Sequence, residues 1–149
     1  MTTLAVRGTL VVIALLAVAW LALGARAVRL EDEAGAVIDR ARAGPVSGVD
    51  VDRAREQLQQ AREFSPDQGP LIQEGQLLYA TGLDRQAALI ARAVTADEPD
   101  NLQGWFLAWA ADPDPKGKRE ALDQLRRLNP YIDVAIGLRE CVDCPLTER

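Results

Sequence analysis

Two cysteines separated by two residues, Cys141 and Cys144, are the side chains of this 149-residue sequence whose type and spacing most directly suggest chemistry. A C-x-x-C pair can be redox-active where a helix N-terminus stabilises the attacking thiolate, and it can supply half of a zinc site. Only five residues follow Cys144, too few for the helix and sheet of a thioredoxin-like fold. We therefore favour a disulfide between the two cysteines, which fits an oxidising, extracytoplasmic location. A redox or metal role, an intermolecular disulfide and free thiols are the alternatives.

The composition excludes several classes of function. The sequence contains no histidine, which rules out Ser-His-Asp and Cys-His catalysis, most zinc sites and haem held by a proximal histidine. Seventeen basic residues against 22 acidic ones give a net charge of −5, which argues against nucleic acid as the main partner. No P-loop, glycine-rich phosphate cradle or D-x-D-x-D-G calcium loop occurs. We expect no catalytic residue, no cofactor and no metal, and hence a binding protein rather than an enzyme.

Charged residues gather in one part of the chain without forming a recognisable site. A short basic stretch comprises Lys116, Lys118, Arg119, Arg126 and Arg127. The acidic residues that precede or adjoin it are Asp97, Glu98, Asp100, Asp112 and Asp114. We expect local pairing on solvated surfaces, where an ion pair contributes roughly 0–1 kcal/mol.

A run of uncharged, mostly apolar residues extends from Gly8 to Ala25, between Arg7 and Arg26. As a helix it would be about 27 Å long, close to the roughly 30 Å hydrocarbon core of a bilayer. Trp20 lies near its far end, where indole rings favour the membrane interface. The sequence therefore predicts a retained transmembrane helix. A signal peptide cleaved at the A-x-A-like site that ends at Ala27 is the main alternative, and a buried soluble helix is a lesser one.

The flanks of this run give conflicting signals on orientation. More arginines follow the run than precede it, which favours a cytoplasmic C-terminal part. A seven-residue N-terminal flank with one arginine is nevertheless typical of a signal-anchor. We expect a cytoplasmic N-terminus and an extracytoplasmic body. From Leu30 onward the sequence holds 14 basic and 22 acidic residues, a net charge of −8.

The remainder of the sequence predicts helices and no strands, so the fold class is all-α. The apolar helix is expected to continue to Gly44-Pro45. A second helix is expected to begin near Asp50, as its N-cap, and to end before Ser65. Four further helices are expected at about 70–81, 84–95, 102–111 and 115–128.

Three of these helices carry an alanine at matching positions, Ala54, Ala87 and Ala121, with nearly equal spacings of about 34 residues. An apolar residue follows four positions later in each unit, and a proline closes it. In this respect the chain resembles the tetratricopeptide repeat (TPR) family, whose 34-residue unit is a helix–turn–helix. The residues that match the repeat pattern are Ala54, Gly75, Gly82, Ala87, Pro99, Trp105, Ala121 and Pro130.

The sequence also departs from the family pattern in places. Leu78 stands where the middle repeat usually has an aromatic residue, and Tyr79 follows one position later. Trp109 occupies a position where a small residue is usual. The first unit has no separate first helix, so the continuation of the membrane helix would have to supply it. About two and a half units are present, where roughly three are needed for a stable array.

The resemblance implies a groove, lined by the first helices of the units, that takes a peptide or a helix of a protein partner. Carried over to this sequence, its residues are Ile72, Gln76, Tyr79, Gln103 and Phe106. The alternative is that Ile72, Tyr79 and Phe106 are ordinary core residues, because aromatic and aliphatic residues at helical spacing usually pack inward.

Together these patterns predict four segments. They are an anchor at 1–29 with its span at 8–25, a connecting helix and break at 30–48, TPR-like repeats at 49–130, and a capping helix with the cysteine-containing tail at 131–149. The function we expect is that of a membrane-anchored scaffold or assembly factor, with the bilayer and a protein as its partners. One alternative function is that of an accessory protein of thiol-redox or cytochrome maturation that uses Cys141 and Cys144. Another is that of an anchored spacer without a groove.

Overall fold

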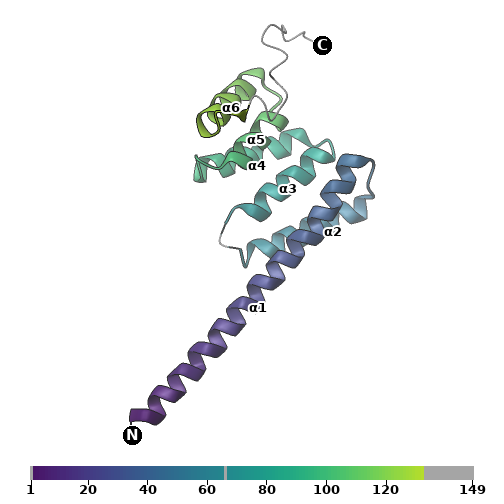
Figure 1. Cartoon of the computed structure of the whole chain (residues 1–149). Coiled ribbons are helices and arrows are strands. Elements are labelled where there is room, and N and C mark those ends of the chain that lie inside the picture. Colours follow the sequence, from purple (N-terminus) through teal and green to yellow (C-terminus); the bar gives the residue numbers. More distant parts are fainter. Residues whose placement is uncertain (1, 66, 133–149) are drawn as a thin grey trace.

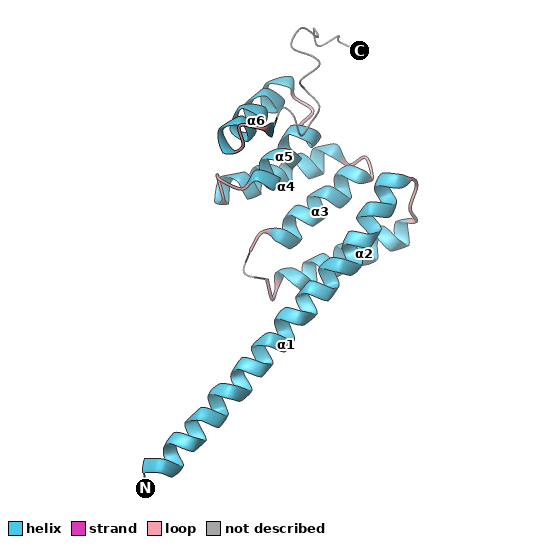
Figure 2. Ribbon diagram, viewed as in Figure 1, coloured by secondary structure: helices cyan, strands magenta, loops and turns pink. Residues whose placement is uncertain are grey.

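The computed structural model describes residues 2–65 and 67–132, and all regular structure in these ranges is helical (Figures 1 and 2). The capping helix expected from residue 131 and both cysteines lie outside the described residues, except for Tyr131 and Ile132. The six helices are α1 (Thr2–Ala43), α2 (Gly48–Arg62), α3 (Gly69–Ala80), α4 (Asp84–Asp97), α5 (Leu102–Ala111) and α6 (Pro115–Leu128).

Helix α1 is uninterrupted from the apolar run into the folded body, which confirms the expected continuation of the apolar helix. Figure 1 shows its N-terminal half projecting alone and its C-terminal half lying against α2 and α3. The projecting part is long and apolar enough to cross a membrane, and Trp20 there is 71% exposed. The boundary expected at residues 29 and 30 thus falls within a single helix.

Short capping motifs set where the other helices begin. Ser47, not Asp50, is the N-cap of α2, because its side chain accepts a hydrogen bond from the backbone N–H of Asp50. Asp50 instead lies in the first turn, where its negative charge favours the positive end of the helix dipole. Asn101 and Asp114 cap α5 and α6 in the same way as Ser47 caps α2.

Consecutive helices form three hairpins, α1–α2, α3–α4 and α5–α6, and each hairpin packs on the next. The first helices of the hairpins are neighbours, because α3 contacts both α1 and α5. The second helix of one hairpin also contacts the first helix of the next, as α2 does with α3 and α4 with α5. Among the described helices, α2, α4 and α6 do not contact one another. The body is therefore a stacked row of helical hairpins.

The core consists of two clusters that follow this stacking. One joins α1, α2 and α3 and contains Ala34, Val37, Ile38, Ala54, Leu58 and Leu77. The other joins α3 to α6 and contains Leu78, Ala87, Ala88, Ala91, Leu107, Ala108, Ala111 and Ala121, with Trp105 and Trp109 packed against it. Leu77 and Leu78 lie next to each other on α3 but belong to different clusters, so α3 is the central helix of the body.

Small residues allow the helices to approach closely. Ala54, Ala87 and Ala121, the regularly spaced alanines of the sequence, are all at most 1% exposed. A Cβ on Gly75 would overlap the Cδ2 atom of Leu107 on α5. Gly82 has a φ of +78°, the left-handed conformation that glycine adopts readily, and it ends α3 where the sequence indicated.

Candidate functional site

The predicted groove residues lie on the first helices of the second and third hairpins. Ile72, Gln76 and Tyr79 have a spacing of i, i+4, i+7 on α3, and Gln103 and Phe106 have a spacing of i, i+3 on α5. Each set therefore lies on one face of its helix. The two helices contact each other.

These five residues differ in exposure. Tyr79 is 44% exposed and Phe106 is 43% exposed, so neither is a core residue, whereas Ile72 is only 2% exposed. The ring of Phe106 is 5.5 Å from that of Trp109, with the two planes inclined by 49°. This distance lies within the range of favourable aromatic pairs, so one side of the Phe106 ring packs against Trp109.

Gln76 is already hydrogen-bonded within the chain. Its Oε1 atom accepts a hydrogen bond of 3.1 Å from Nη2 of Arg42, which ties α3 to the end of α1. Arg42 also pairs with Asp39 one turn earlier, at 3.3 Å. The amide nitrogen of Gln76 is the group that a partner could still use.

Ile72 and Gln103 come together at the N-terminal ends of α3 and α5. They line one hollow of about 350 Å³, whose other lining residues are Asp67, Gln68, Gly69, Glu98, Asn101 and Leu102. Tyr79 is two helical turns further along α3 and does not line this hollow. Of the predicted groove residues, Ile72 and Gln103 thus share one hollow, whereas Tyr79 and Phe106 present exposed aromatic side chains further along their helices.

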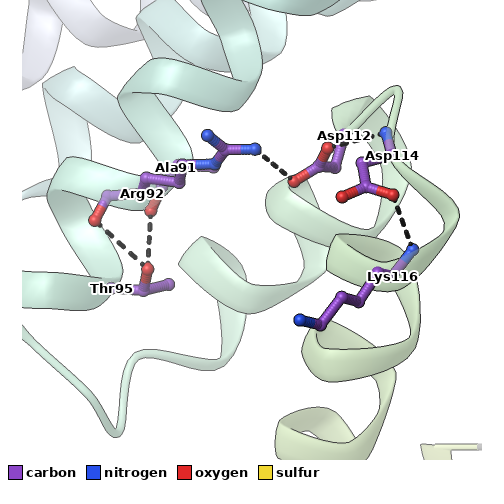
Figure 3. Close-up of polar contacts among 6 residues, drawn as sticks. All are labelled: Ala91, Arg92, Thr95, Asp112, Asp114 and Lys116. Atoms are coloured by element: carbon purple, nitrogen blue, oxygen red, sulfur yellow. Dashed lines mark hydrogen bonds and ion pairs between the residues drawn. The ribbon is translucent and has the colours of Figure 1, made fainter.

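A second hollow, of about 460 Å³, lies on another side of the body, between α4, α5 and α6. An ion pair crosses its rim, because Nη2 of Arg92 donates a 2.8 Å hydrogen bond to Oδ2 of Asp112 (Figure 3). The other oxygen of Asp112 accepts a 2.9 Å bond from the backbone N–H of Asp114. The guanidinium lowers the pKa of Asp112, and the carboxylate in turn raises the pKa of Arg92.

This arrangement links α4 to the turn between α5 and α6. Both carboxylate oxygens of Asp112 have donors, and a carboxylate with a lowered pKa is a weak base. The hydroxyl of Thr95, also on the lining, donates to the carbonyls of Ala91 and Arg92 within its own helix (Figure 3). We interpret the pair as a clamp between α4 and the α5–α6 turn.

The sequence did not single out Arg92. It lies on α4, 20 residues before Asp112, and only the packing of α4 against the α5–α6 hairpin brings the two side chains together. The expected local pairing of the charged stretch is seen where Arg127 contacts Asp100 at 2.9 Å. That pair is largely exposed and therefore contributes little stability.

Trp105 and Pro99, two of the residues that match the repeat pattern, contact each other. The indole Nε1 of Trp105 donates a 2.8 Å hydrogen bond to the carbonyl of Pro99 in the turn between α4 and α5. Nη2 of Arg127 reaches the same carbonyl at 3.3 Å. Pro130, the proline that closes the third unit, follows the C-cap of α6 and is exposed.

The described part of the chain presents no candidate metal centre. No group of three or more carboxylate, histidine or cysteine side chains within residues 2–65 and 67–132 is placed to hold a metal ion. Cys141 and Cys144 lie outside these ranges, so their pairing stays a prediction.

Comparison of the chain with protein-family models, with curated proteins and with solved structures finds no match.

Proposed function

We propose that this protein is a single-pass membrane protein whose body is a short TPR-like array that binds a protein partner, as a scaffold or assembly factor. The observation that carries the proposal is the double role of α1. Its N-terminal part exposes an apolar surface long enough to cross a bilayer, and its C-terminal part is the first packed helix of the hairpin row. An anchor joined in this way to a stack of hairpins is suited to hold a binding surface beside a membrane.

Three observations support a TPR-like array. The regularly spaced alanines Ala54, Ala87 and Ala121 are buried at equivalent places, each in the second helix of a hairpin. The first helices of neighbouring hairpins contact each other, and the second helix of each hairpin contacts the first helix of the next. The hydrogen bond between Arg42 and Gln76 joins residues 34 positions apart, one repeat length, on the first helices of neighbouring hairpins.

Tyr79 and Phe106 are the centre of the proposed binding surface. Aromatic side chains contribute much of the energy of protein interfaces, because they bury a large area and lose little conformational freedom. Gln76 and Gln103 add amide groups to the same faces of α3 and α5. An extended peptide with apolar side chains and free backbone polar groups, or a helix with apolar and polar side chains on one face, matches this combination, and no catalytic role is needed to explain it.

Alkaline extraction of native membranes tests the anchor. The full chain should stay in the membrane pellet, with its N-terminus on the cytoplasmic side and its body extracytoplasmic in a protease-protection assay. Release of a shortened chain that begins near Ala27 would show cleavage and contradict the anchor.

A matched pair of variants tests the binding surface. In the double variant Tyr79→Ala and Phe106→Ala, partner recovered with the protein from solubilised native membranes should be lost while the melting temperature changes little. Leu89→Ala is the control, because Leu89 is 63% exposed on α4, away from the proposed surface. A folded double variant that recovers its partner as well as the control would contradict the proposed surface.

A further inference from the structure

The change from exposed to buried along α1 is abrupt. From Leu10 to Arg26 every side chain is exposed, and Ala27, at 4%, is the first buried one. Ala27 is two residues beyond the end of the apolar run at Ala25, which is about 3 Å along a helix axis. Since α1 has no break here, no flexible linker separates the apolar run from the body.

The part of the body nearest to the apolar run is the end of α2 and the turn into α3. Helix α2 runs back along α1, so that its C-terminal end points toward the N-terminal half of α1 (Figure 1). The turn after it lies beside Glu31, whose Oε2 accepts a 3.3 Å hydrogen bond from Nε2 of Gln73. An added Cβ on Gly69, at the start of α3, would be 3.5 Å from the same oxygen.

The rise per residue of a helix gives the distance of each position on α1 from the end of the apolar run. Glu31 is six residues beyond Ala25, which is about 9 Å along the axis. The polar headgroup layer extends roughly 5–8 Å beyond the hydrocarbon core on each side. If the run ending at Ala25 spans the core, the α2–α3 turn lies at the outer edge of the headgroup layer.

Two arginines of α1 lie at the depth of the lipid phosphates. Arg26 and Arg29 are exposed and three residues apart, hence on one face of α1. Neither forms an ion pair with another described residue. Guanidinium groups bind phosphate oxygens through paired hydrogen bonds. The carboxylates that follow on the body are Glu31, Asp32, Glu33, Glu63 and Asp67, and they disfavour a strongly anionic membrane surface.

We propose that Arg26, Arg29 and the α2–α3 turn seat the body directly on the phosphate layer of a zwitterionic bilayer. This inference rests on the proposed membrane anchor. The body is then held at a fixed height, with the C-terminal end of α2 facing the lipid and the α1–α2 turn facing away from it. A partner of the hairpin row must therefore approach close to the membrane surface.

Fluorescence quenching by nitroxide lipids tests this arrangement in the full chain, with Cys141→Ser and Cys144→Ser to remove the native thiols. The protein is placed in phosphatidylcholine nanodiscs, and an environment-sensitive dye is attached at Glu63→Cys in one sample and at Val49→Cys in another. Both positions are exposed, and they lie at opposite ends of α2. A headgroup nitroxide should remove most of the fluorescence at position 63 and little at position 49. Equal, weak quenching at both positions would overturn the seating.

A third labelled position separates failure of the seating from failure of the anchor. A dye at Leu15→Cys, 64% exposed in the apolar run, should be quenched by a nitroxide on the acyl chain. Quenching at position 15 without quenching at position 63 would refute the seating and keep the anchor, whereas no quenching at position 15 would refute both. With Arg26→Gln and Arg29→Gln added, headgroup quenching at position 63 should fall, and an unchanged signal would contradict the role of the arginines.

Discussion

Replacing Gly75 with alanine should destabilise the body, although alanine is the better helix former. Gly75 is buried in the middle of α3, where that helix packs against α4 and α5. A Cβ at this position would overlap Cδ2 of Leu107 and lie 3.1 Å from Cγ2 of Ile90. Leu107 is itself in the core, so it has little room to move. The close approach of three helices therefore depends on the absence of a side chain here.

Two opposing effects set the magnitude. In an open helix position, glycine to alanine stabilises by about 0.5–1 kcal/mol. Forcing an extra methyl group into a well-packed core costs about 1–3 kcal/mol. We expect the packing cost to exceed the helix gain, with a net loss of about 1 kcal/mol. For a body of this size, that corresponds to a fall in melting temperature of about 4–8 °C.

Gly35→Ala is the matched control for this substitution. Gly35 lies inside α1, and no heavy atom of another part of the chain is within 4 Å of its ideal Cβ. Thermal unfolding followed by circular dichroism should show Gly35→Ala raising the melting temperature slightly and Gly75→Ala lowering it. If both substitutions raise the melting temperature, the proposed close packing at Gly75 is wrong.

Three further predictions concern the last two hairpins. Asp112→Asn should destabilise the folded protein at neutral pH, because Arg92 lowers the pKa of Asp112 below its ordinary value of 3.8. The wild-type protein should therefore melt at a higher temperature than the variant above pH 3.8. Thermal melts in acid should show this difference in melting temperature lost as the pH falls below 3.8. Trp105→Phe removes one hydrogen bond to the α4–α5 turn and should cost about 1 kcal/mol in urea unfolding, and an unchanged midpoint would argue against that bond. Removal of residues 131–149 takes away Ile132, which is 5% exposed, and should lower the melting temperature. A truncated chain that melts as the full chain does would contradict this packing.

The helices could be predicted from sequence where local signals are strong. The range found for α6 is the expected one, because Asp114 caps it, Pro115 suits its first turn and Asn129-Pro130 ends it. The N-cap of α2 was predicted wrongly, three residues too late, because Asp50 and Ser47 are both residues that suit an N-cap. Only the backbone conformation decides between them, and Ser47 is the one that accepts the capping hydrogen bond.

The candidate site could be predicted only in part. The resemblance to the TPR family placed Tyr79 and Phe106 in the expected groove, but helical spacing alone could not tell exposed aromatic residues from buried ones. Their exposure depends on which helix covers that face, and this is set by the stacking of the hairpins. The pair of Arg92 and Asp112 depends entirely on the same stacking, because no local pattern links positions 92 and 112.

The central claim is that this chain is a membrane-anchored binding protein, and site-specific photo-crosslinking in intact native membranes is its most direct test. A photoreactive phenylalanine analogue is placed at Phe106 in one sample and, as a control, at Leu89 on α4, which is also exposed. We predict one discrete membrane-associated adduct from position 106 and none from position 89. No adduct at position 106, or the same adducts from both positions, would contradict the proposed binding surface.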